Sequence, residues 1–466
     1  MHEPLILTPV AVARRVFFAH PVALGLVAAT MLLSTASYAA QPQCLPSDRW
    51  NPDMQMCMPN AKAVPGTAAS GPSLDQGRTT APDAGTAAMP TPPIASRRPT
   101  SSAGMDMDDG EKSKSPFMLQ INQFVVYSHT AGPRGQSRVT GPGTWMLMYD
   151  RDLAPRNHLS VSLMASPEQL TVGDKGTPQL LQTENIDSMH AHDTIMALEF
   201  RDVIALGSGG DQQLTLLFAP RGAAAIGPVP FMHRLSAEGN PDAPLGHGLQ
   251  DGFHDASTVL GIEYHIAGTT AEATVFSGKA VSWPLPLHSP DSFAFRLTQD
   301  IDDHVKVGAS YGDVLSPDDA GVEKHSQFIS AWLATTHQVG PGTLRSSLVW
   351  ARGRDGNSAS QTSLLAEAVY QRGLNAFFGR AEILQITPEQ LDAVTIGSPT
   401  DPRWVKAFTL GYERTLVELH GLSLRFGGSY TKDFVPSAFK PEYGSDPGGF
   451  KLFLRIKFAT NDGHVM

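Results

Sequence analysis

After residue 40 the sequence contains no apolar stretch approaching the ~20 residues that a membrane-spanning helix requires. Any insertion of this part of the chain into a membrane would therefore have to use strands. Cysteine is scarce, with only Cys44 and Cys57 in the whole chain, and basic residues are outnumbered, which leaves a net charge of −10. Because nucleic acid attracts basic surfaces, this charge argues against a nucleic-acid partner.

The N-terminal segment has the pattern of a secretory signal peptide. Arg14 and Arg15 precede the apolar run 22–33, and the small residues Ser37 and Ala39 follow at the spacing of a cleavage site. The run is too short to span a bilayer. We therefore predict a signal peptide over residues 1–39 and an exported protein.

Residues 40–114 read as a low-complexity tether, rich in Ala, Pro, Ser, Thr and Gly. Such a composition buries too little apolar surface to offset the entropy of ordering, so we predict a disordered periplasmic segment. In an oxidising compartment Cys44 and Cys57 are expected to form a disulfide that closes a small loop.

Methionine recurs around the second cysteine, at Met54, Met56 and Met58. Thioethers are soft ligands that suit Cu(I). The spacing resembles Met-rich segments of periplasmic copper-handling proteins, which makes these residues candidate metal ligands. The alternative is that this segment is only a small loop closed by the disulfide and binds no metal. The absence of accompanying histidines favours this alternative.

The segment 450–458 alternates apolar residues with Lys451, Phe453, Arg455 and Lys457. Successive side chains of a strand point to opposite faces, so this is a strand with one apolar and one mainly basic face. A strand of this kind, ending on the aromatic Phe458, resembles the closing strand of bacterial outer-membrane proteins. The sequence departs from that pattern because residues 459–466 follow the aromatic.

Segments of period two repeat between residues 115 and 460, and residues 461–466 form a tail. The predicted strands are 117–128, 142–150, 157–165, 193–203, 212–220, 255–267, 270–280, 291–299, 303–313, 325–337, 342–352, 360–371, 374–384, 404–415, 420–431 and 448–458.

Connections after odd-numbered predicted strands are mostly long and those after even-numbered strands are mostly tight. A soluble β-sandwich has no reason for this alternation, whereas an outer-membrane barrel has long loops on one rim and short turns on the other. We therefore predict an all-β fold, a transmembrane antiparallel up-and-down β-barrel of about 16 strands, within a range of about 14–18.

A barrel of this size has a water-filled lumen unless something fills it. Alternation places Glu263, Arg296, Arg425 and Arg455 on the lumen face. The predicted protein lies in the outer membrane with its N-terminal segment in the periplasm. Its expected partners are outer-membrane lipid, small solutes or ions, and the barrel assembly machinery during insertion.

The longest loop, 221–254, is rich in proline and contains the apolar residues Phe231 and Met232. The third long loop of general porins folds into the lumen, and this is also the third long loop. The stretch Phe-Met-His-Arg at 231–234, with the Pro, His and Asp residues after it, resembles a pattern in uncharacterised outer-membrane proteins. We expect a constriction in which Arg234 meets lumen carboxylates such as Glu263, Asp251 meets lumen bases, and Glu238 contributes charge.

Five histidines belong to this loop and the preceding one: His190, His192, His233, His247 and His254. If the loops meet, these side chains could converge, and imidazole with carboxylate suits Zn(II), Cu(II) or Ni(II). The alternative is that they cap turns and pair with neighbouring carboxylates. We expect the three histidines of the longer loop, His233, His247 and His254, to titrate near neutral pH.

These patterns favour a pore for small solutes, linked to transition-metal handling, with no required cofactor and Cu or Zn as candidate metals. The alternative is a metal-binding protein that uses the barrel as an anchor. A hydrolase built on Ser236 with His233, or on His254 with Asp255, comes third, because the sequence has no Gly-x-Ser-x-Gly motif. We therefore predict that the protein is not an enzyme.

Overall fold

The computed structural model describes residues 48–51, 56–59, 116–206, 212–279, 287–317, 323–356, 359–393, 398–419, 421–445 and 447–460. The predicted signal peptide, most of the tether, Cys44 and Met54 lie outside these residues. The chain divides into two units, residues 22–95 and the remainder. In the first unit β1 (Asp48–Asn51) pairs antiparallel with β2 (Met56–Pro59), with Trp50 opposite Cys57. The predicted disulfide stays a prediction.

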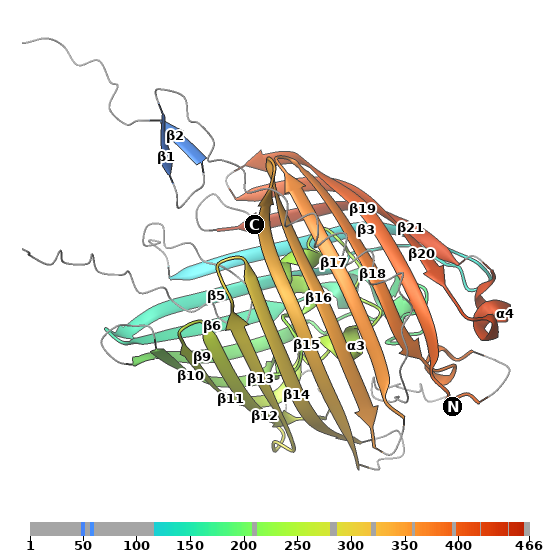
Figure 1. The fold of residues 1–466 in the computed structure, drawn as a ribbon, viewed down its shortest axis with the longest axis horizontal. Helices are drawn as coiled ribbons and strands as arrows, with labels where there is room; N and C mark the ends of the chain where they lie inside the picture. The colour runs from blue at the N-terminus through green and yellow to red at the C-terminus, as the bar shows by residue number, and fades with distance from the viewer. Residues whose placement is uncertain are drawn as a thin grey trace, which may run out of the picture. The chain divides into compact units, whose positions relative to one another are not determined.

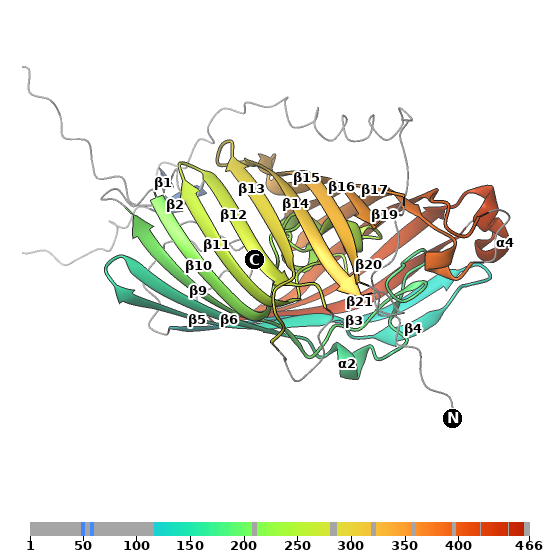
Figure 2. The same ribbon diagram turned by 90° about the horizontal axis from the view of Figure 1, so that it is seen from below.

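The second unit is a closed antiparallel barrel of sixteen strands among the described residues, as predicted (Figures 1 and 2). The ring closes where β21 pairs with β3, and β4 and β5 both pair with β3 as two parts of one strand. The strands are β3 (Phe117–Ala131), β4 (Ser137–Thr140), β5 (Gly143–Ala154), β6 (Asn157–Ala165), β9 (Ile195–Leu206), β10 (Gln212–Gly222), β11 (Ala256–Ile266), β12 (Thr269–Ser277), β13 (Ser292–Asp300), β14 (Val305–Pro317), β15 (Glu323–Val339), β16 (Gly342–Asp355), β17 (Gln361–Arg372), β18 (Asn375–Ile386), β19 (Arg403–Leu419), β20 (Leu422–Phe434) and β21 (Gly448–Ala459).

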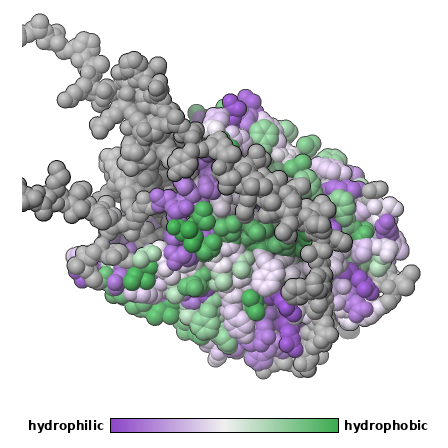
Figure 3. All heavy atoms as spheres, in the orientation of Figure 1, coloured by the Kyte–Doolittle hydropathy of each residue, from purple (hydrophilic) through white to green (hydrophobic). Residues whose placement is uncertain are grey.

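The outer face of the ring is apolar and the inner face is largely polar. On β21, Leu452, Leu454 and Ile456 are exposed, whereas Arg455 and Lys457 are buried. Apolar side chains gather on the visible outer wall in Figure 3. This is the arrangement of a barrel whose outside faces lipid. None of the helices in the described part of the chain is long and apolar enough to cross a membrane.

Several strands run longer than predicted, at both rims, whereas β11 and β12 are shorter than predicted. The predicted strand 303–313 becomes β14, and 325–337 becomes β15, so the connection between them shortens to residues 318–322. β4 lies inside a segment predicted to be a loop, where it continues the pairing with β3. Strand pairing between distant segments extends these elements, and local alternation does not reveal it.

The remaining long loops carry short elements. The loop after β6 holds α2 (Glu168–Thr171) and the β7–β8 hairpin (Thr177–Pro178 and Ser188–Met189). The loop after β10 spans residues 223–255 and is called the inner loop below. Its elements are η1 (Phe231–His233), η2 (Leu235–Ala237) and α3 (His247–Gln250). The last two long loops hold η3 (Glu389–Leu391), and η4 (Ser437–Phe439) with α4 (Lys440–Tyr443).

The two rims give a test of orientation in the membrane. Leu170, in α2, is 92% exposed on the long-loop rim, and Arg372 is exposed at a tight turn on the other rim. We expect L170C, in a C44S/C57S background, to react with a membrane-impermeant maleimide on intact cells. R372C should react only after the envelope is opened. Equal labelling of both positions in intact cells would contradict the topology.

Candidate functional site

The inner loop crosses the lumen instead of projecting from the rim. It leaves the ring at β10 and returns at β11, yet Arg234, Ser236 and Glu238 pair with β16, β17 and β21, on the other side of the ring. Figures 1 and 2 show the segment carrying α3 within the ring of strands. The loop therefore occupies the cross-section through which a solute would pass.

Backbone contacts fix the start of the inner loop to the wall. The Ala225 amide donates to Thr274 Oγ1 at 3.0 Å, and the Gly227 amide donates to Ser310 Oγ at 2.7 Å. Gly227 has φ +77, and a Cβ there would lie 1.8 Å from the Gln250 carbonyl oxygen. Only glycine fits this turn, because it tolerates positive φ and the close backbone approach.

Arg234 is the central ionic anchor of the inner loop. Its Nε lies 2.5 Å from Glu367 Oε1 on β17, and its Nη1 lies 2.7 Å from Asp251 Oδ2. All three side chains are buried. Ser236 adds a hydrogen bond of 2.9 Å to the same carboxylate oxygen of Glu367. Arg234 therefore meets a carboxylate of the lumen wall, as expected, but this is Glu367 and not Glu263. Asp251 pairs with Arg234 inside the loop rather than with a base of the wall.

Two carboxylates hold the far side of the inner loop against a basic wall. Glu238 Oε1 lies 2.5 Å from Lys457 Nζ and 3.7 Å from both Arg425 and Arg455. Asp242 forms an ion pair with Lys451. These bases come from β20 and β21, whose basic inner faces were visible in the sequence. The sequence places Lys451 on the basic face of its strand, but it does not predict that Asp242 is its partner.

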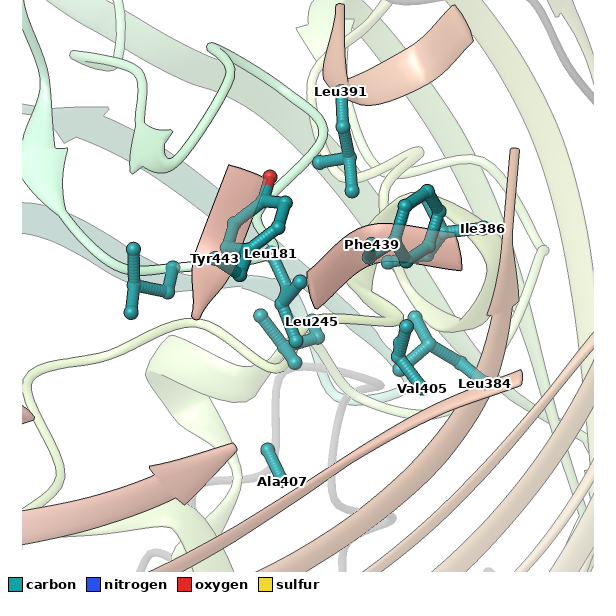
Figure 4. Close-up of a cluster of buried hydrophobic side chains, with 10 residues drawn as sticks. Leu181, Leu245, Leu384, Ile386, Leu391, Val405, Ala407, Phe439 and Tyr443 are labelled. Carbon is teal, nitrogen blue, oxygen red and sulfur yellow. The ribbon is translucent and has the colours of Figure 1, made fainter. Parts of the chain in front are cut away.

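An apolar cluster fastens the inner loop to neighbouring loops at the long-loop rim. Leu245 packs with Leu181 of the preceding loop, with Leu391 after β18, and with Phe439 and Tyr443 before β21 (Figure 4). Wall residues of β18 and β19 complete the cluster: Leu384, Ile386, Val405 and Ala407. Burial of these side chains lets four long loops support one another.

Two cavities border the loop where it meets β21. The larger, about 200 Å³, is lined by Glu238, Asn240 and Ala243 of the inner loop and by Arg455 and Lys457 of the wall. The smaller, about 30 Å³, is lined by Asp242 and Leu245 with Lys451, Arg380 and Glu382. Inner-loop residues 240–243 therefore line both spaces, which follow one another along β21.

The other predicted lumen residues are buried and face inward, where they pair with wall groups. Glu263 lies 3.8 Å from Arg201, and Arg296 lies 2.6 Å from Glu272 and donates to the Gly227 carbonyl. Arg425 and Arg455 also share Glu413, at 3.0 and 3.4 Å. These ion pairs form the wall on which the loop rests.

Four of the five predicted histidines form a row between the inner loop and the loop before it. Ring centroids are 5.4 Å apart for His190 and His192, 5.6 Å for His192 and His254, and 5.2 Å for His254 and His247. The fifth, His233, lies elsewhere, with Nε2 3.2 Å from Met164 Sδ. The expected convergence of all five is therefore wrong.

In three histidines of the row, Nδ1 contacts a carboxylate oxygen. The distances are 3.0 Å from His190 to Glu184, 2.7 Å from His192 to Glu168, and 2.5 Å from His247 to Asp251. Among the described atoms, Nε2 of His192 and of His254 is buried without a hydrogen-bond partner. Within the described residues no group of three or more His, Cys, Asp or Glu side chains is arranged to hold a metal ion.

Four of these histidines have pKa values that depart from the usual range. Burial lowers the pKa of His233 and of His254 to about 4. Burial also disfavours charge on His190, but the Glu184 carboxylate outweighs it and raises the pKa of His190 to about 9. The pKa of His247 is raised in the same way by Asp251, against its burial. The expected titration near neutral pH is therefore not found for His233 and His254.

The residues considered for hydrolysis do not pair. Ser236 Oγ donates to Glu367 Oε1 and lies 2.7 Å from Ser347 Oγ, whereas His233 contacts Met164. Asp255 accepts from Arg221 at 2.6 Å, and His254 Nδ1 lies 3.3 Å from the Asp251 carbonyl oxygen. Neither arrangement places a nucleophile beside a base.

Arg234 gives a test of how the inner loop is held. R234Q leaves Glu367 and Asp251 buried without this cation, and breaking a buried ion pair in this way costs about 3–5 kcal/mol. We expect a loss of this order in guanidinium unfolding of the refolded barrel. Cleavage by a glutamate-specific protease at Glu238 should also appear in the variant.

The matched control is K306Q, which breaks the exposed Lys306–Asp300 pair of 3.2 Å, whose side chains are 43% and 41% exposed. Exposed pairs contribute about 0–1 kcal/mol. Equal effects of R234Q and K306Q would show that Arg234 does not anchor the loop.

The lowered histidine pKa values predict a loss of stability in acid. The unfolded chain takes up protons at His233 and His254 below about pH 6.5, while the folded chain holds both neutral down to about pH 4. Stability should therefore fall as the pH drops through this window. We expect H233Q/H254Q to lose less stability than the wild type between pH 6.5 and 4, by on the order of 1–3 kcal/mol.

H304Q, at an exposed position on the short-turn rim, serves as control and should leave the profile unchanged. His190 acts in the opposite direction, because stability from its raised pKa is complete below about pH 6.5 and is lost as the pH rises through about 9. Its side chain is 41% exposed, so solvent screening reduces this contribution. Parallel acid profiles for wild type and H233Q/H254Q would refute the assignment.

Comparison with protein-family models and with curated proteins finds no match for this chain. Among solved structures, a loop-deletion form of OmpT, an outer membrane protein of Vibrio cholerae, is 7% identical and covers 74% of this chain and 100% of its own, with a TM-score of 0.45. The anion-selective porin from Comamonas acidovorans is 13% identical, covers 74% and 98%, and has a TM-score of 0.44. OmpF of Salmonella typhi, in complex with daunomycin, is 11% identical, covers 73% and 97%, and has a TM-score of 0.45.

At these identities the likeness concerns the fold alone and says nothing of solute or activity. What identifies the fold is the chain's own strand topology and its apolar outer face. By these features the protein is a porin-like outer-membrane β-barrel.

Proposed function

We propose that this barrel is a pore for small solutes or ions, narrowed by the inner loop. The observation that carries the proposal is the pair of cavities along β21, lined by residues 240–243. A barrel built only as an anchor has no need for a loop folded across its lumen on buried ion pairs. Movement or replacement of a few loop residues would join the two cavities into one path.

Charge supports a selective rather than a neutral passage. Lys451, Arg455 and Lys457 line the two cavities from β21, and Glu238 and Asp242 face them from the inner loop. Charged groups with low-dielectric walls around them act strongly on passing ions. The balance between the two sides would then set which ions enter.

In this proposal the N-terminal segment lies in the periplasm. Support comes from β3, whose first residues pair with β5 close to the tight turn between β5 and β6. The start of β3 and the end of β21 therefore both lie on the short-turn rim. The predicted signal peptide agrees with this placement.

A link to transition-metal handling is the finer part of the proposal. The row of histidines favours it, because Nδ1 held by a carboxylate with Nε2 left open is how metal-binding imidazoles are oriented. The side chains form a row rather than a convergent set. The methionines described in the next subsection supply a more compact set of ligands.

Planar-bilayer recordings of the purified protein test the pore. E238Q/D242N leaves Lys451 and Lys457 without their carboxylate partners, so we expect the reversal potential in a salt gradient to move toward anion preference. Deletion of 239–249 removes the segment that lines both cavities and should raise single-channel conductance. Heat-modifiable migration in gels checks that each variant is folded.

E418Q, which changes an exposed carboxylate at the short-turn end of β19, is the control for charge and should leave selectivity unchanged. Absence of conductance in the wild type and in the deletion variant would refute the pore. Unchanged conductance on deletion, in a wild type that conducts, would refute the constriction.

A further inference from the structure

Methionines line part of the barrel's inner wall, where polar side chains are the rule for a water-filled lumen. On β5, Met146 and Met148 are buried, whereas Trp145 and Leu147 between them are 43% and 42% exposed on the outer face. Met164 of β6 and Met196 of β9 are also buried, and they pack with these two in one cluster. Apolar side chains at these positions are not explained by contact with lipid.

Strand register brings the methionines side by side. Met118 lies opposite Met148 across β3 and β5, and Met146 lies opposite Met164 across β5 and β6. Met196 precedes Ala197, the partner of Met164 on β9. Directly opposite residues of antiparallel strands have Cβ atoms about 4.5–5.5 Å apart, and the long thioether side chain adapts its conformation easily. Thioethers from four adjacent strands thus share one patch.

The inner loop completes this group with one more thioether and an imidazole. Met232 packs against the cluster, and His233 Nε2 lies 3.2 Å from Met164 Sδ. A nitrogen and a sulfur that bind one tetrahedral ion lie about 3.5 Å apart, given metal–ligand bonds of ~2.0 and ~2.3 Å. The observed separation is close to that value. We name these side chains the methionine patch: Met118, Met146, Met148, Met164, Met196, Met232 and His233.

The patch is accessible and chemically suited to a soft cation. Met146, Met232 and His233 line the larger cavity, so an ion in the lumen can reach them. Thioether ligands select Cu(I) over harder ions.

We propose that the methionine patch binds a soft monovalent metal ion of the Cu(I) class, with Met146, Met164 and His233 as its nearest ligands. The site differs from Met54, Met56 and Met58 of the N-terminal segment and from the row of histidines. The inference rests on the proposed function only for entry of the ion through the lumen. Binding can be measured whether or not the protein conducts.

The test is anaerobic titration of the refolded full-length protein in detergent with Cu(I), using bicinchoninate as competitor. A background with M54L/M56L/M58L and C44S/C57S removes the N-terminal thioethers and both thiols. We expect this protein to retain one tightly bound Cu(I), with sulfur and nitrogen neighbours in X-ray absorption. Adding M146L/M164L should weaken binding at least about tenfold, and H233Q should remove the nitrogen neighbour.

Leucine nearly preserves the volume of methionine, so M146L/M164L should fold, which heat-modifiable migration verifies. M189L is the matched control, because Met189 is buried beside the same cavity but lies outside the patch. Equal Cu(I) affinity of M146L/M164L and M189L, or no binding in the background protein, would show that the methionines only fill space and that His233 only bonds to sulfur. Conductance of the same preparations, recorded without metal, separates that failure from failure of the pore.

Discussion

The structure depends on closure of the ring between β21 and β3. Inside a bilayer every backbone amide and carbonyl needs a partner within the protein, because no water is present to supply one. Pairing of β21 (Gly448–Ala459) with β3, the first strand of the barrel, removes the last free edge. Once the ring is closed, period two sends apolar side chains outward and charged ones inward, and sixteen strands leave room for a loop in the lumen.

The inner loop fills this space with charged side chains, whose burial costs free energy. Ion pairs with residues of the barrel wall offset that cost. Arg234, Asp251 and Glu367 are buried, and each would be unfavourable alone. Together with the bases around Glu238 and Asp242 they form a network that tolerates a charged loop in a crowded space. The same network leaves two cavities beside β21, so the features that hold the loop are also those that would control passage.

The lumen contains two kinds of metal-ligand chemistry in different places. Three of the four histidines in the row pair with carboxylates, which agrees with the pairing expected as their alternative role. The methionine patch has buried thioether side chains and one imidazole, whose Nε2 contacts a sulfur rather than a carboxylate. The thioether ligands of the patch, rather than the number of histidines, therefore give the stronger indication that this barrel would bind a soft ion such as Cu(I).

The sequence by itself determined the class of fold, an approximate number of strands, the face on which Arg425, Arg455 and Lys457 lie, and which loop enters the lumen. These follow from alternation and loop length, which are local properties that lipid and water impose on every strand. Only the tertiary structure decided that Arg234 meets Glu367, that Asp242 meets Lys451, and that His233 leaves the other histidines for Met164. Such partners lie far apart along the chain, and their meeting depends on the path of the inner loop and on strand register, neither of which a local pattern encodes.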